Sequence, residues 1–302
     1  MDIVTAYFDI NRENWKSFNR SFEKYFDKFS KWSKLNNNII CYVNSQEIAE
    51  RIISLRKEYG LLHKTQLVVL PDYKELDIEL YESIKKVSSN RIQRNFHVFP
   101  NNPESYNADY NYVMMLKFWC LKDALKRNLY TSDFVMWLDF GYSPLIEGTN
   151  FEFEWGKEKF ENDKINMFSI KKITDVPIFD IVRNMDTILV GCLFSLNIMH
   201  VDWLWSNMRA NMISLNKVGL MDDDQVIMLM CYREKPELFK INKSRWDDII
   251  FEYSDAKCNC LTNVRDKDFA LRTKLRKLKL FFRRVNYIIR EFKYIIKYGD
   301  IG

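Results

Sequence analysis

In this 302-residue chain, the position of Asp139 indicates a residue that contacts a ligand. It directly follows the continuously apolar residues 134–138, and Phe140 and Gly141 come next. Such a run is typical of a strand buried on both faces of a parallel sheet, whose carboxyl end is where open α/β sheets bind ligands. A lone buried carboxylate is costly without a metal ion, a hydroxyl or backbone N–H groups as partners. Asp139 therefore either caps a turn or contacts a divalent metal or a ribose hydroxyl.

A second group of carboxylates consists of Asp222, Asp223 and Asp224, followed by Gln225 and an apolar stretch. Asp222 with Gln225 predicts a capping box at a helix start, where acidic residues suit the helix dipole. Capping needs one carboxylate, and three adjacent ones repel each other unless a cation, a proton or a substrate hydroxyl relieves the repulsion. We expect Asp223 or Asp224 to act as a general base on an acceptor hydroxyl; the alternative is a helix start alone.

Several residues give weaker signals. Lys117 interrupts an apolar helical stretch, and Arg12 and Arg183 are candidates to meet a phosphate. Gly191 follows an apolar run and predicts a close backbone approach beneath a ligand. The Cys-Asn-Cys segment at 258–260 lacks the further ligands of a zinc site, and the chain has no glycine-rich phosphate loop. A bound diphosphate would then have to be neutralised by a metal ion and side chains.

The order of the predicted elements places these residues on an α/β sheet. Strands alternate with helices at short spacing in the first part of the chain, which is typical of parallel pairing. The predicted strands are residues 3–8, 38–43, 65–70, 134–138, 164–169 and 188–196. The predicted helices are residues 15–35, 45–59 and 112–126, one beginning near residue 222, and a long final one beginning near residue 268. Residues 100–110 are expected to form a loop.

Composition limits the class of protein. Hydrophobic residues make up 47% and aromatic residues 15% of the chain, which excludes a disordered protein. No apolar run is long enough to span a membrane, and the first residues do not form a signal peptide. The six cysteines are scattered, mostly in apolar runs, as is typical of reduced thiols in a cytosolic protein. We therefore expect a cytoplasmic protein.

The last part of the chain is strongly basic. Residues 271–298 contain ten Lys or Arg against one Glu, a net charge of +9, which leaves −4 for the remainder. Apolar residues recur there at spacings of three and four, as on one face of a helix; they are Leu271, Leu275, Leu278, Phe282, Val285, Ile289, Phe292 and Ile296. Basic residues lie between them, namely Arg272, Lys279, Arg283, Arg290, Lys293 and Lys297.

This basic amphipathic tail has two interpretations. Its apolar stripe either packs on the body or on a second copy of the chain, as in a homodimer, or it lies in an anionic membrane surface. We expect peripheral attachment to the inner face of the plasma membrane, with a body at 1–265 and the tail at 266–302. Nucleic acid is not an expected partner, because no nucleic-acid motif and no second basic patch occur.

Three segments together resemble the HtrL/YibB-like family, bacterial proteins that look like glycosyltransferases of the GT-A type. They are residues 3–10 with Arg12 and Trp15, residues 137–142, and residues 223–225, and the likeness covers about residues 3–255. The resemblance implies a GT-A-like, Rossmann-type domain with a mixed, mainly parallel sheet flanked by helices. It also implies transfer of a hexose from a UDP-linked donor, with UDP-galactose as one candidate, to a glycan or lipid-linked acceptor. The expected setting is capsule or lipopolysaccharide synthesis.

The resemblance also implies roles for particular residues. The implied donor-binding residues are Thr5, Ala6, Tyr7, Arg12, Lys117, Asp139, Gly141 and Gly191. The implied acceptor contacts are Asp222 and Gln225, with Asp223 or Asp224 as the catalytic base. Asp139 would hold Mn²⁺ or Mg²⁺, but Gly141 stands where such enzymes usually carry a second metal-binding acid, so metal dependence stays open. The alternative is a non-catalytic protein that binds a glycan or nucleotide and retains the fold.

Overall fold

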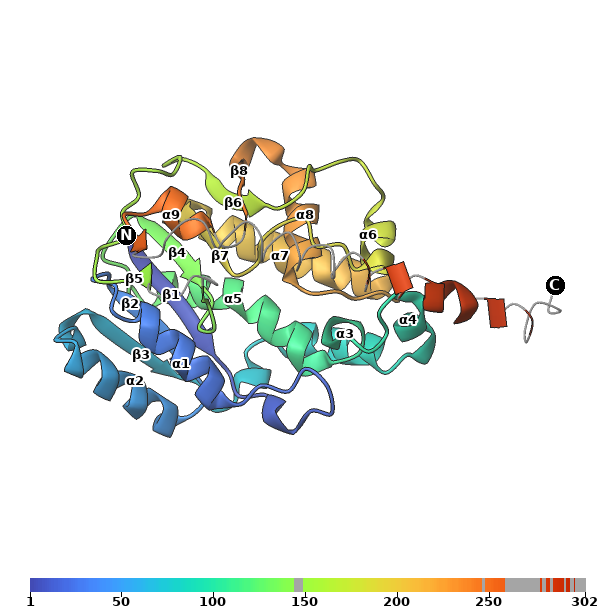
Figure 1. The fold of residues 1–302 in the computed structure, drawn as a ribbon, viewed down its shortest axis with the longest axis horizontal. Helices are drawn as coiled ribbons and strands as arrows, with labels where there is room; N and C mark the ends of the chain where they lie inside the picture. Colours follow the sequence, from blue (N-terminus) through green and yellow to red (C-terminus); the bar gives the residue numbers. More distant parts are fainter. Residues whose placement is uncertain are drawn as a thin grey trace.

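A computed structural model describes residues 1–143, 149–245 and 248–258, together with residues 278, 281–282, 285–290, 292–293 and 296 of the tail. One seven-stranded sheet lies between two layers of helices (Figure 1). In spatial order its strands are β3 (Thr65–Val69), β2 (Ile39–Val43), β1 (Asp2–Tyr7), β4 (Phe134–Leu138), β7 (Leu193–Asn197), β6 (Ile165–Ser169) and β8 (Phe239–Lys243). β7 pairs antiparallel with β4 and β6, and the other pairs are parallel. The predicted mixed, mainly parallel α/β sheet is confirmed and is consistent with a Rossmann-like fold.

The helices lie on both faces of this sheet. They are α1 (Phe22–Trp32), α2 (Gln46–Glu58), α3 (Ile78–Ser88), α4 (Arg91–Phe96), α5 (Ala108–Lys126), α6 (Ile178–Asn184), α7 (Val201–Lys217), α8 (Asp224–Glu234) and α9 (Ile249–Tyr253). Alternation along the strands divides the core, because successive side chains of a strand point to opposite faces. Val4 and Ile40 pack with α3, α5, α7 and α8, whereas Ile3 and Ile39 pack with α1, α2 and α9. A separate two-stranded sheet pairs β5 (Thr149–Asn150) with β9 (Lys257–Cys258).

The centre of the sheet contains a topological switch point. β1 has β2 on one side and β4 on the other, both parallel to it. The connections that leave the carboxyl ends of β1 and β4 therefore diverge, and such a divergence opens a crevice for ligands. Asp139 immediately follows β4 and so lies at this crevice.

Several predicted boundaries were wrong. The helix predicted for 15–35 begins only at Phe22, because Phe18 has a φ of 60°, which interrupts a helix. Part of the predicted loop 100–110 is helical, since α5 begins at Ala108. Of the strand predicted for 188–196, Leu189 forms only an isolated bridge to Ser169, and β7 begins at Leu193. The elements α3, α4, α6, α7, α9 and β8 were not predicted, although the buried residues of α7 recur at helical spacing.

The described part of the tail is helical at each of its residues. The stripe residues Leu278, Phe282, Ile289, Phe292 and Ile296 are between 47% and 75% exposed, so they do not pack on the body. Val285 is half-buried, and Leu271, Leu275, Arg272, Lys279, Arg283 and Lys297 lie outside the described residues.

Polar contacts attach this helix to the body. Arg183 Nε donates to the Tyr287 hydroxyl at 2.9 Å, and Arg290 donates to the carbonyls of Asn95 and His97 at 2.7 and 3.1 Å. Among the described residues, no helix is both long and apolar enough to cross a membrane.

Candidate functional site

A cavity of about 420 Å³ opens at the carboxyl ends of β1 and β4. Its walls come from the end of β1, from α1 and the segment before it, from α5, and from residues 139–143 after β4. This volume lies within the range of ordinary small-molecule sites. The predicted residues Ala6, Tyr7, Arg12, Lys117, Asp139 and Gly141 line it.

Lys117 holds the buried end of this site together. Its ammonium group lies 2.8 Å from Asp224 Oδ2, 3.1 Å from Asp139 Oδ1 and 3.1 Å from the Gly191 carbonyl oxygen. These three acceptors match the three N–H donors of an ammonium group. Burial alone lowers the pKa of Lys117, but Asp139 and Asp224 outweigh burial and raise that pKa above its ordinary value. A charged lysine therefore bridges the two predicted groups of carboxylates.

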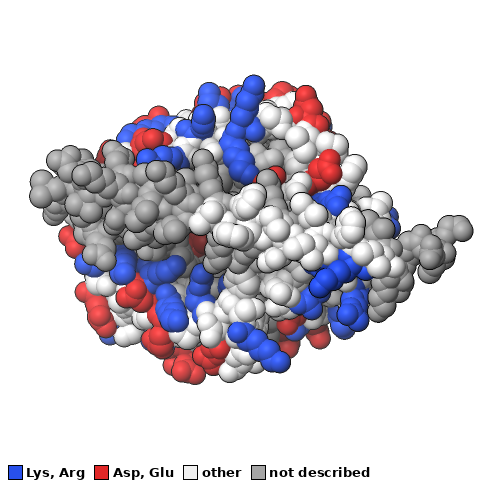
Figure 2. All heavy atoms as spheres, turned by 45° about the vertical axis from the view of Figure 1, so that its right-hand side comes forward, with Lys and Arg blue, Asp and Glu red and all other residues white. Residues whose placement is uncertain are grey.

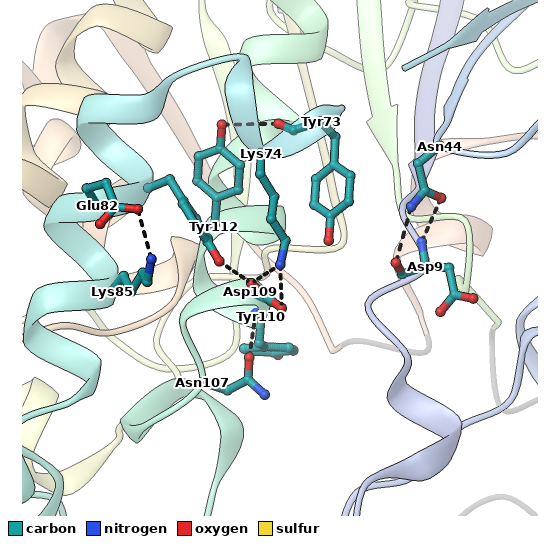
Figure 3. A network of polar contacts seen from close by, with 11 residues as sticks. Asp9, Asn44, Tyr73, Lys74, Glu82, Lys85, Asn107, Asp109, Tyr110 and Tyr112 are labelled. Atoms are coloured by element: carbon teal, nitrogen blue, oxygen red, sulfur yellow. Dashed lines mark hydrogen bonds and ion pairs between the residues drawn. The ribbon is translucent and has the colours of Figure 1, made fainter. Parts of the chain in front are cut away.

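α5 presents Lys117 from a fixed starting point. The Asn107 side chain caps this helix by accepting from the Tyr110 backbone N–H at 2.9 Å (Figure 3). Asp109 in the first turn accepts from Lys74 at 2.9 Å and from the Tyr81 hydroxyl at 2.8 Å. These contacts fix the beginning of a 19-residue helix, and Lys117 lies two and a half turns further along it.

Asp139 is held at the cavity wall and remains partly open. Its Oδ1 accepts from Trp137 Nε1 at 2.7 Å, and its backbone N–H donates to the Cys192 carbonyl at 2.8 Å. Its side chain is 31% exposed, compared with 2% for Asp224. Asp139 is therefore the carboxylate of this pair that a ligand can reach.

The carboxylate run is arranged differently from the predicted capping box. α8 begins at Asp224, and its cap is Asp223, whose side chain accepts from the Gln225 N–H at 3.1 Å. The prediction that Asp222 caps this helix with Gln225 was therefore wrong, because the helix begins too late. Asp222 Oδ1 instead accepts from the Asp223 N–H at 2.8 Å. Asp222 and Asp224 are buried, and Asp223 is half-buried.

These carboxyl groups have unusual proton affinity. Burial raises the pKa of Asp223 to about 7, with a further contribution from Glu104 and an opposing one from Lys117. Burial also raises the pKa of Asp224 to about 7, against the lowering effect of Lys117. For Asp222, burial and then Asp223 raise the pKa well above its ordinary value. Such a cluster can take up or release a proton near neutral pH. Glu104 was missed because it lies in a segment predicted to be a loop, where the sequence gives no signal for it.

The opposite wall of the cavity is cationic. Arg12 donates to the Tyr25 hydroxyl at 2.8 Å and to the Phe18 carbonyl at 3.0 Å. Arg20 lies over the Tyr25 ring, with its guanidinium carbon 5.1 Å from the ring centroid. Lys28 of α1 lines the same wall. Arg20, Tyr25 and Lys28 were not predicted, since basic and aromatic residues on a helix face give no signal that sets them apart from ordinary surface or core residues.

The lack of space beside position 141 explains why a glycine is found there. A Cβ atom at this position would lie 2.7 Å from Tyr25 Cδ1, closer than side chains approach. The Tyr25 ring therefore occupies the space that a side chain at position 141 would need.

Other predicted residues lie behind or away from the cavity. Thr5 is buried within β1. Asp222, Asp223, Asp224 and Gln225 do not line the cavity, and Asp224 lies behind its wall, in contact with Lys117. Gly191 does not line it either, and its close neighbour is Asp224, since a Cβ at this position would lie 2.6 Å from Asp224 Oδ2. Arg183 contacts Tyr287, as described above.

A second cavity of about 840 Å³ adjoins the first. Trp15 lines it, and the Trp15 ring lies 6.4 Å from the ring of Tyr110, which lines the first cavity. Arg12 lies over both rings, at 5.3 and 5.5 Å from their centroids. The second cavity is rich in aromatic and amide side chains, namely Trp15, Phe18, Phe99, Tyr106, Tyr287, Asn101, Asn102, Asn107 and Asn286.

The residues of the first cavity are a poor fit for a resident divalent ion. In the described ranges, no three His, Cys, Asp or Glu side chains are grouped as metal ligands. Asp139 carries the Lys117 ammonium on its Oδ1 atom, so a metal ion there would lie beside a fixed positive charge.

Comparison with known proteins identifies the family. The profile of a family described as "Bacterial protein of unknown function (HtrL_YibB)" matches residues 1–255. The chain belongs to the HtrL/YibB family. Protein HtrL of Escherichia coli (strain K12) is 29% identical over 265 residues, which cover 82% of this chain and 90% of that protein. The resemblance inferred from the sequence is confirmed, while the activity must be argued from the site.

Proposed function

We propose that this member of the HtrL/YibB family is a glycosyltransferase that moves a hexose from a nucleotide sugar, with a UDP-linked sugar as the expected donor, to an acceptor hydroxyl. One observation carries the proposal. A cavity at the switch point of the sheet has carboxyl groups of raised pKa behind one wall and several cations on another. Proton removal from an acceptor and stabilisation of a departing diphosphate need these two environments side by side.

Asp223 is the proposed base, because it is the most exposed member of the run. Its carboxylate takes the proton of the acceptor hydroxyl while the acceptor oxygen forms a bond to the sugar C1. The bond from C1 to the diphosphate oxygen breaks, and its electron pair leaves with the diphosphate. Cations at the cavity then stabilise that charge. Asp224 is proposed as a positioning residue that holds Lys117, and Asp139 as a contact to the donor ribose.

The second cavity is the proposed place of the acceptor. Ring faces and amide groups suit a glycan, which presents C–H surfaces and hydroxyl groups together. Trp15 of the second cavity lies edge-on to Tyr110 of the first, with Arg12 over both rings, so an acceptor in the second cavity would lie beside a donor in the first. Surface-polysaccharide synthesis remains the proposed setting.

Turnover of nucleotide sugars tests this function. We expect the full chain to release UDP from a UDP-hexose when a glycan acceptor is added, and Asp139→Ala to abolish transfer without loss of folding. Asp133→Ala is a matched control, because Asp133 is an exposed acid at the other end of β4. A donor that raises the melting temperature without any product would favour the non-catalytic alternative. Parallel reactions with Mn²⁺ and with EDTA test the metal dependence, which the sequence leaves open.

We also propose that the tail holds the enzyme at the cytoplasmic face of a membrane. The large apolar side chains at 281, 282, 288, 289 and 292 are all exposed, while Tyr287 and Arg290 attach the helix to the body. Figure 2 shows Lys and Arg side chains bordering uncharged surface on the α4 side of the molecule. Exposed apolar residues on a basic helix suit an anionic lipid surface.

Liposome co-sedimentation tests this attachment. The full chain should bind vesicles that contain phosphatidylglycerol at low salt and lose them as salt rises, because screening weakens the charge attraction. Phe281→Ser with Phe282→Ser should reduce binding, whereas Phe179→Ser, an exposed aromatic residue on α6, should not. If the full-length protein does not bind the vesicles and sediments as a dimer, the apolar stripe of the tail packs against a second copy of the chain instead.

A further inference from the structure

We infer that Arg12, Arg20 and Lys28 form an anion subsite at the rim of the first cavity, which binds a diphosphate without a metal ion. The inference rests on the proposed function only for the ligand that carries this diphosphate. The three residues come from the η1 segment (Arg12–Asn14), from the loop after it and from α1.

The charges that line the cavity do not balance. Arg12, Arg20, Lys28 and Lys117 line it, together with Asp139 as the single carboxylate in the described lining. Lys117 and Asp139 already pair with each other at 3.1 Å. Three cations are left at the rim, and none of them forms an ion pair with a carboxylate in the part of the chain that the structure describes.

Tyr25 holds two of these cations in place. Its hydroxyl accepts from Arg12, and its ring lies beneath Arg20. The absence of a side chain at Gly141 makes room for this ring. The guanidinium groups are therefore positioned by neutral partners, which leaves their charge available to an anion.

The backbone before α1 also serves Arg12. Phe18 has a φ of 60°, a left-handed conformation that is costly for an aromatic residue, and it is 45% exposed. Its carbonyl accepts from Arg12 Nε at 3.0 Å. A strained, exposed turn that directs a carbonyl at one arginine is consistent with a site that is organised before its ligand arrives.

The proton affinity of Lys28 supports the same conclusion. Burial lowers its pKa, and Arg20, Lys31 and Arg12 lower it further, against a smaller raising effect of Asp27. Like charges therefore crowd at this rim in the absence of a ligand. Two linked phosphates relieve that crowding and accept hydrogen bonds from all three side chains.

Calorimetric titration with inorganic pyrophosphate in EDTA tests the subsite directly. We expect the full-length protein to bind pyrophosphate, and Arg20→Gln with Lys28→Gln to weaken this binding by about tenfold or more, since two charge-assisted contacts are lost. Lys57→Gln is the control: it removes the same charge from the neighbouring helix α2, where Lys57 is exposed and does not line the cavity. The double substitution should weaken UDP binding as it weakens pyrophosphate binding, and it should leave uridine binding unchanged.

The outcomes separate this inference from the proposed function. Pyrophosphate that binds the double variant as tightly as the wild type, that fails to bind the wild type, or that binds only with Mn²⁺ would overturn the subsite. Pyrophosphate binding that is lost in the double variant, in a protein that binds no nucleotide sugar, would uphold the subsite and refute the donor.

Discussion

An acidic region lies behind the wall of the first cavity and a cationic region lines that cavity, and the two differ in how their charge is compensated. On the acidic side, Asp222 and Asp224 are buried, and Lys117 supplies an internal counter-charge. On the cationic side, Arg20 and Lys28 are only half-buried and contact no described carboxylate as an ion pair. Buried carboxylates respond by binding protons more tightly, whereas half-exposed guanidinium and ammonium groups stay charged.

This difference suits the two regions to different roles, namely proton transfer and anion binding. In the acidic region the counter-charge comes from the protein itself, and the carboxyl groups can take up or release a proton near neutral pH. In the cationic region no described carboxylate pairs with the cations, and the proposed bound anion supplies the counter-charge.

Removal of Lys117 should give the largest effect. Lys117→Met leaves Asp224 buried without its partner, so we expect the free energy of unfolding to fall by roughly 3–5 kcal/mol at pH 8. The loss should be smaller at pH 5, where Asp224 is protonated because its pKa is about 7. Urea denaturation at both pH values measures this, with Lys126→Met, an exposed position of the same helix, as the control. Equal stability of Lys117→Met and wild type at pH 8 would break the comparison.

Asp223→Asn should separate catalysis from capping. Asparagine caps helices as well as aspartate does, so the stability should be retained. The proposed base is lost, so turnover should fall by about a hundredfold or more with donor binding unchanged. Product formation and the melting temperature are measured on the same sample. A variant that keeps its rate and only melts earlier would reduce Asp223 to a helix cap.

Stability and activity should depend on pH in opposite directions. Asp223 and Asp224 have a pKa of about 7 in the fold, above their ordinary value, so between about pH 4 and pH 7 the folded state binds more protons than the unfolded state. The free energy of unfolding should therefore fall as pH rises through this window, by up to about 1.4 kcal/mol per pH unit for each proton involved. Turnover should rise over the same window, because the base must be deprotonated. Stability that increases from pH 5 to pH 7 in the wild type, but not in Asp224→Asn, would contradict the assignment.

Gly141→Ala should give the smallest effect and reports on the rim. The new Cβ would press on the Tyr25 ring, whose side chain can shift, so we expect a stability loss of about 1 kcal/mol. Displacement of Tyr25 should also weaken pyrophosphate binding several-fold through Arg12. In a Tyr25→Ala background the same substitution should cost little, as a double-mutant cycle can measure.

The sequence was sufficient for most strands of the main sheet, although not for β8 or the start of β7, and for the chemical character of the site. Short, continuously apolar runs such as 39–43 and 134–138 are typical of strands in a sheet covered on both faces, so these strands and the position of Asp139 followed from local pattern. The crowding of Asp222, Asp223 and Asp224 likewise predicted unusual carboxylates before any partner was known. Family membership was also readable from short segments of the chain.

Only the tertiary structure decided which charges meet. Lys117 and Asp224 are 107 residues apart, and neither local pattern contains information about the other. The Tyr25 ring beside Gly141 and the Phe18 carbonyl on Arg12 depend on the path of a loop whose left-handed residues no periodicity reveals. The spacing of the apolar tail residues predicted one apolar face of a helix, but it did not predict that this face is exposed. Exposure depends on which elements pack against the helix, and the periodicity of one helix contains no information about them. Periodicity and composition act over a few residues, whereas the pairing of charges is set by packing between elements distant in the chain.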